Sequence, residues 1–95
     1  MKLLVILPCL NEEKTLKHVI ESIPSSLEGI SSLDILIIND GSTDNSCAVA
    51  EAAGAFVISH RTNLGVGRAF RSGLDYAISN SYDIMVSIKA SSKIL

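Results

Sequence analysis

The 95-residue sequence contains no tryptophan, only two tyrosines and two phenylalanines, and only two cysteines. Proteins that bind single-stranded nucleic acid stack bases on aromatic side chains beside basic grooves, so a 4% aromatic content and a net charge of −2 argue against a nucleic-acid partner. Cys9 and Cys47 follow no metal-ligand spacing. They are predicted to be buried thiols of a cytoplasmic protein.

Long apolar runs are also absent, and none approaches the roughly 20 residues that a membrane-spanning helix needs. The opening segment MKLLVILPCL has a lysine followed by an apolar run, but it lacks a small-residue cleavage site. A first strand is therefore predicted there, and membrane association is expected only through segments that this sequence lacks. The hydrophobic content of 47% predicts one folded domain.

Four short apolar runs are present, and none alternates as a half-exposed strand would, which predicts strands covered on both faces. They span residues 3–7, 35–38, 55–58 and 84–88. A helical pattern lies between each pair. This order predicts an α/β fold, a Rossmann-like three-layer α/β/α arrangement with a parallel sheet.

Each helical pattern has an apolar face expected to pack on the sheet. The first helix should begin at an Asn11 N-cap, end before Pro24 and bury Leu16, Val19, Ile20 and Ile23. The second should run from residues 42–44 to Gly54 and bury Ala48, Val49, Ala52 and Ala53. The third, over residues 67–79, should bury Phe70, Leu74, Ala77 and Ile78.

Polar loops follow three of the strands, namely PCLNEE (8–13), NDGSTD (39–44) and SHRTNLGVGRA (59–69). The carboxyl ends of parallel strands share one edge of the sheet, where ligands bind. A carboxylate at Asp40 suits a base N–H or a ribose hydroxyl, although a simple turn role is an equally good interpretation. The glycines of the third loop suit phosphate or a structural turn, and they match neither a Walker loop nor a dinucleotide fingerprint. Neither His18 nor His60 is predicted to bind a metal.

The segments VILPCLNEE, LIINDGSTDNS, NLGVGRAFRSGLDYA and YDIMVSI together resemble the beginning of family-2 glycosyltransferases. These GT-A fold enzymes move a sugar from a nucleotide-sugar donor, and the nearest likeness is to polyprenyl-phosphate sugar transferases of the dolichol-phosphate mannosyltransferase kind. The resemblance implies strand order 3-2-1-4 and a UDP- or GDP-sugar donor. It also implies a nucleotide-binding site formed by Pro8, Leu10, Glu12, Asp40, Gly41, Arg68 and Arg71.

In the family, an Asp-x-Asp motif after the fourth strand holds Mg²⁺ or Mn²⁺ against the donor diphosphate. Lys89 and Ser91 occupy the matching positions here. The resemblance therefore implies a metal ion for the intact family, but neither a metal site nor a catalytic residue in this chain.

The chain is accordingly expected to be a truncated GT-A fold, with residues 1–95 forming the N-terminal nucleotide-sugar-binding part and no second domain. It should bind a donor nucleotide without turnover, and the exposed edge of its last strand is expected to form a homodimer. Two alternatives stay open: a non-catalytic nucleotide-binding remnant and a small α/β interaction domain. Binding of a nucleoside diphosphate distinguishes the first from the second.

Overall fold

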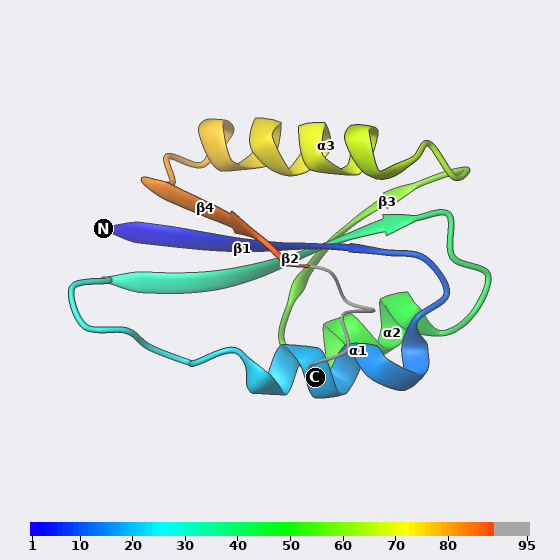
Figure 1. Cartoon of the computed structure of the whole chain (residues 1–95), viewed down its shortest axis with the longest axis horizontal. Coiled ribbons are helices and arrows are strands. Elements are labelled where there is room, and N and C mark those ends of the chain that lie inside the picture. The colour runs from blue at the N-terminus through cyan, green and yellow to red at the C-terminus, as the bar shows by residue number, and fades with distance from the viewer. Residues whose placement is uncertain (89–95) are drawn as a thin grey trace.

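The structure, a computed structural model, describes residues 1–88 and consists of four strands alternating with three helices (Figure 1). The elements are β1 (Lys2–Cys9), α1 (Glu13–Ser22), β2 (Ser32–Asp40), α2 (Ser46–Ala52), β3 (Phe56–His60), α3 (Val66–Ser79) and β4 (Ile84–Ser87). All pairings are parallel and the strand order is β3-β2-β1-β4. The predicted fold class and the order 3-2-1-4 are thus confirmed.

The sheet forms the middle of three layers, with α3 on one face and α1 and α2 on the other (Figure 1). Side chains of the central strand β1 alternate between the two faces. Leu4 and Ile6 pack under α3, while Leu3, Val5 and Leu7 pack under α1 and α2. Because both faces are covered, the strand reads as a continuous apolar run, as the sequence indicated.

Helix α1 packs with the predicted face, burying Leu16 and Ile20. The predicted N-cap is wrong, because the helix begins at Glu13 with Glu12 in the N-cap position. Asn11 instead adopts a left-handed conformation with φ of 52° and directs its side chain to another loop.

The predicted inner face of α2 is mostly wrong. Val49 is half-buried and packs against the core, but Ala48, Ala52 and Ala53 are exposed. The helix begins later than expected, at Ser46, because residues 42–45 form a hydrogen-bonded loop in place of the first helical turn. Its fully buried residues are Ser46 and Ala50.

The predicted inner face of α3 is only partly right. Ala77 is buried and Leu74 is half-buried, but Phe70 and Ile78 are 43% and 69% exposed. The helix packs through its small residues Ala69, Gly73 and Ala77, which allow it to approach β1 closely.

Within the described residues, the sheet has two edge strands, β3 and β4, each paired on one side. Cys9 is buried as predicted, whereas Cys47 is half-buried, and both are free thiols. Among residues 1–88, none of the helices has the length and apolar character needed to cross a membrane.

Candidate functional site

Three loops gather at the carboxyl edge of the sheet, where β1, β2 and β3 end (right side of Figure 1). Five predicted residues lie at this edge: Pro8, Leu10, Glu12, Asp40 and Gly41. Because β1 and β2 are paired in register up to Cys9 and Asn39, the residues that follow them enter the site side by side.

Asn11 joins the first two loops. Its Oδ1 accepts hydrogen bonds from the amides of Thr43, at 2.8 Å, and Asp44, at 3.3 Å. The backbone amide of Asn11 donates to Ser42 Oγ at 2.9 Å. The left-handed backbone, which asparagine tolerates, aims the side chain at these amides. Asn11 therefore fixes the β2–α2 loop against the end of β1.

Ser46, which is fully buried, makes a second connection between the loops. Its Oγ donates to Asp44 Oδ1 at 2.5 Å and accepts from the Glu12 amide at 3.1 Å. Asp44 Oδ2 also accepts from the Glu13 amide at 3.3 Å. The hydrogen bond from Ser46, aided by the amides, holds the pKa of Asp44 below its ordinary value.

Glu12 is half-buried, and its two carboxylate oxygens differ in their hydrogen bonding. Its Oε1 accepts from the Leu10 amide at 3.1 Å, whereas its Oε2 is buried and has no hydrogen-bond partner among residues 1–88. Beside it, burial raises the pKa of the Cys9 thiol, and the charge of Glu12 adds to this effect. A buried carboxylate oxygen without a donor is costly, so this atom marks a place where a donor group is missing.

Asp40 is 6% exposed and accepts three hydrogen bonds. Its Oδ1 accepts from His60 Nδ1 at 2.8 Å and from the Leu64 amide at 2.9 Å, and its Oδ2 accepts from the Gly65 amide at 2.9 Å. Burial is the largest influence and raises the pKa, but the hydrogen bonds together outweigh it and lower the pKa of Asp40. A carboxylate has about four acceptor positions, so one remains, on Oδ2.

His60 connects Asp40 to α3, because its Nε2 lies 2.8 Å from Ser72 Oγ. Neither His60 nor Ser72 was predicted to belong to the site. The signal that reveals His60 is the strand register, in which Asp40 and His60 are direct partners at the ends of β2 and β3. Ser72 carries no such signal, because its contact depends on how α3 packs.

Gly41 brings the second and third loops into contact. It has a φ of 85°, and a Cβ there would lie 2.8 Å from the Asn63 nitrogen and the Thr62 carbonyl carbon. Such contacts do not occur for real side chains, so glycine is required at this position.

The two predicted arginines lie on α3, and both are exposed. Arg68 lies in the first turn of the helix. Arg71 Nε is 3.3 Å from Asp75 Oδ1, one turn further along, and these side chains are 72% and 63% exposed. An ion pair so accessible to water contributes little, which leaves Arg71 available for another anion.

A metal ion finds no suitable ligand set in the described part of the chain. Residues 1–88 contain no group of three or more histidine, cysteine, aspartate or glutamate side chains arranged to hold one. Lys89 and Ser91, which the resemblance predicts to occupy the positions of the family's metal motif, lie outside the described residues.

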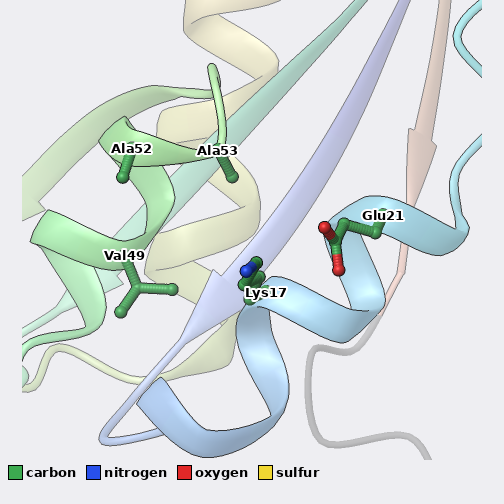
Figure 2. A pocket seen from close by; sticks show the side chains of 5 residues that line it. All are labelled: Lys17, Glu21, Val49, Ala52 and Ala53. Carbon is green, nitrogen blue, oxygen red and sulfur yellow. The ribbon is translucent and has the colours of Figure 1, made fainter.

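A groove of about 320 Å³ lies elsewhere, between α1 and α2. Lys17 and Glu21 of α1 face the α2 side of this groove (Figure 2). The α2 side is formed by Val49, Ala52 and Ala53. None of these five residues lies at the carboxyl edge of the sheet, where Glu12, Asp40 and the three hydrogen-bonded loops are found. The groove is therefore separate from the candidate site.

Comparison with known proteins gives a consistent result. The model of the family described as "Glycosyl transferase family 2" matches residues 4–86. The 4,4'-diaponeurosporenoate glycosyltransferase of Staphylococcus aureus is 39% identical over 56 residues, which cover 59% of this chain and 14% of that protein. An uncharacterised protein of Methanocaldococcus jannaschii is 28% identical over 89 residues, which cover 94% of this chain and 35% of that protein.

Solved structures of the glucosyl-3-phosphoglycerate synthase of Mycobacterium tuberculosis are also similar. A complex with Mn²⁺, UDP and glucosyl-3-phosphoglycerate has a TM-score of 0.72 and 33% identity, covering 94% of this chain and 33% of that chain. A complex with Mg²⁺ and UDP has a TM-score of 0.68 and 37% identity, with the same coverage. The chain thus spans about a third of the length of these structures and of the archaeal relative.

Proposed function

This chain belongs to glycosyl transferase family 2, and we propose that its carboxyl sheet edge binds the nucleotide of a nucleoside-diphosphate-sugar donor. Solved relatives bind UDP with Mn²⁺ or Mg²⁺. Sugar transfer to an acceptor is the proposed activity of a complete protein of this kind, and this chain contributes its donor-nucleotide part.

The observation that carries this proposal is a pair of carboxylates with unused acceptor positions at the carboxyl edge of the sheet, one at the N-cap of α1 and one at the end of β2. Within the described part of the chain, Glu12 Oε2 has no hydrogen-bond partner, and Asp40 Oδ2 has one acceptor position left. Carboxylate oxygens of this kind can accept hydrogen bonds from the N–H groups of a base and from ribose hydroxyls. Pro8 and the exposed Leu10 then offer apolar contact to the base.

The diphosphate is assigned to the arginines rather than to the start of α3. Helix N-termini commonly bind phosphate, but the Leu64 and Gly65 amides already donate to Asp40. Arg68 is exposed one turn further on, and Arg71 exchanges its weak pairing with Asp75 for a phosphate oxygen. Because the described residues do not fit a divalent cation, no step is assigned to one.

Calorimetric titration with UDP, and with GDP to identify the base, tests the proposal. Glu12→Gln and Asp40→Asn keep the size of each side chain and remove its charge. Each should weaken binding by about ten-fold, because a charge-assisted hydrogen bond contributes roughly 1.5–3 kcal/mol. Glu28→Gln, at an exposed loop position, is the matched control and should bind as the unaltered chain does. Equal affinity in all four proteins would rule out this site.

The open edge of β4 supports a second proposal, a homodimer formed through this strand. Among residues 1–88, β4 pairs only with β1, and its Val86 and Ser87 side chains are exposed. Unpaired strand edges recruit further strands, and a second copy offers the same edge. A cytoplasmic location stays a prediction, supported by the two free thiols.

A further inference from the structure

A chain of hydrogen bonds runs from β2 through β3 to α3 beside the candidate site. Asp40 Oδ1 lies 2.8 Å from His60 Nδ1, and His60 Nε2 lies 2.8 Å from Ser72 Oγ. The His60 and Asp40 side chains are 10% and 8% exposed. These three residues come from three different elements and form one connected, largely buried network.

The geometry determines which atom donates in the bond between His60 and Asp40. Asp40 is held ionised by its hydrogen bonds, which lower its pKa despite burial, so it only accepts. His60 Nδ1 must therefore carry a hydrogen and donate it to Asp40 Oδ1. In a neutral ring this is the Nδ1–H tautomer, in which Nε2 accepts from the Ser72 hydroxyl, whereas in a charged ring Nε2 donates to Ser72 Oγ. Both ring nitrogens are hydrogen-bonded in either case.

The order Asp, His, Ser resembles a nucleophilic triad, but the surroundings do not support that chemistry. A nucleophile needs amides directed at a developing oxyanion beside it. The Leu64 and Gly65 amides donate instead to Asp40, at the other end of the network. Ser72 also lies within α3 rather than on an exposed turn.

We propose that His60 and Ser72 are positioning residues for the donor nucleotide, an inference that rests on the proposed function. By occupying one position of Asp40 Oδ1, His60 orients the carboxylate so that Oδ1 and Oδ2 receive the two loop amides. The remaining position on Oδ2 then points to the ligand. Ser72 fixes the imidazole ring and links this arrangement to α3, which carries Arg68 and Arg71.

Nuclear magnetic resonance tests the network without any ligand. The ring nitrogen shifts of His60 should show that Nδ1 carries a hydrogen, with His18→Ala assigning the other histidine. The Leu64 and Gly65 amide protons should be strongly deshielded by the carboxylate and should shift in His60→Ala. An Nε2–H tautomer, or loop amides unmoved in His60→Ala, would overturn the proposal.

UDP titration tests the positioning role. His60→Ala should weaken binding roughly ten-fold, because Asp40 loses a charge-assisted hydrogen bond. His60→Asn should recover most of the loss, because its amide can replace Nδ1. Ser72→Ala should weaken binding about two- to three-fold, because the His60 imidazole loses the hydrogen bond that fixes its orientation. Ser79→Ala, at an exposed position of α3, and His18→Ala are controls expected to bind normally.

The outcomes separate this inference from the proposed function. Absence of UDP binding by the unaltered chain would overturn the proposed function and the positioning role together. Normal UDP binding by a folded His60→Ala chain, or equal weakening in His60→Ala and His60→Asn, would overturn only the positioning role. Labelling of Ser72 by a fluorophosphonate would overturn it in favour of a nucleophilic serine.

Discussion

Gly73 of α3 lies directly against Ile6 of β1, so closely that a Cβ at position 73 would lie 2.9 Å from Ile6 Cγ2. Ile6 is fully buried and has little room to move. Gly73→Ala should therefore lower the free energy of unfolding by about 1–3 kcal/mol through overpacking, despite the better helix propensity of alanine. Urea unfolding followed by circular dichroism measures the change.

Gly67→Ala is the matched control on the same helix, because a Cβ there meets nothing within 4 Å. It should be neutral or stabilising by up to about 1 kcal/mol. Shortening the strand residue with Ile6→Val should recover part of the loss in a Gly73→Ala background, because the pair is in contact and its effects are not additive. Additive effects would show that α3 moves instead.

Alanine substitutions at Gly41 and Gly54 distinguish the cost of a left-handed backbone from the cost of a steric clash. Both have a positive φ, of 85° and 88°, but only a Cβ at Gly41 would meet the backbone of residues 62 and 63. Gly54→Ala should cost about 1–2 kcal/mol from the left-handed conformation alone. Gly41→Ala should cost more and should also weaken UDP binding, because the second and third loops are forced apart. Equal losses of stability and unchanged affinity would contradict this.

Asp40 should make stability depend on acidic pH. Its folded pKa lies below the ordinary value of 3.8, so the unfolded chain binds the proton more readily. The stabilisation is therefore fully present above 3.8 and is lost as the pH falls through the lower folded value. Asp40→Asn should flatten the acidic part of the curve of unfolding free energy against pH. Asp44, whose pKa is also lowered, should leave a residual slope.

Divalent cations should not tighten UDP binding by the unaltered chain, because Lys89 and Ser91 stand where the family motif has carboxylates. The double change Lys89→Asp, Ser91→Asp should make binding depend on Mn²⁺, since carboxylates and phosphate oxygens then share the ion. Paired titrations with and without Mn²⁺ measure the difference. Affinities that are independent of the metal in a folded double variant would place the metal site elsewhere.

Association through β4 should depend on concentration in sedimentation experiments. Val86→Lys puts a charge on the exposed edge and should shift the chain toward the monomer. Leu27→Lys removes an exposed apolar side chain from a loop and should leave association unchanged. Equal shifts in both variants would indicate general hydrophobic contact instead of edge pairing.

The sequence was sufficient to predict the strands and their order, because buried parallel strands are continuous apolar runs and the resemblance supplies the order. It was not sufficient for the faces of α2 and α3. Phe70 and Ile78 looked like core residues by spacing, but the close contact of Gly73 with Ile6 decides which face packs. Side-chain size along a helix is thus a better guide here than hydrophobic period alone.

At the candidate site, the resemblance predicted Glu12 and the loop pattern predicted Asp40, but neither predicted the hydrogen bonds around them. The bonds that shape the edge join residues far apart in the chain, so no local pattern contains them. Asn11 looked like a helix cap, which is its commonest use at such a position, yet it serves the neighbouring loop. His60 becomes apparent only when the register of β2 and β3 is known.

The bonds of Asn11 also bear on the order of folding events. They join residues 31 to 33 positions apart, across the connection between β1 and β2. Closing a loop of that length costs entropy, which alignment of the two strands must offset before the asparagine can reach its partners. The binding edge should therefore be among the last features to form. Hydrogen exchange of the Thr43 amide should then require opening of the sheet itself. A bound nucleotide should slow that exchange, so the same experiment would report the ligand affinity and the cooperativity of the fold.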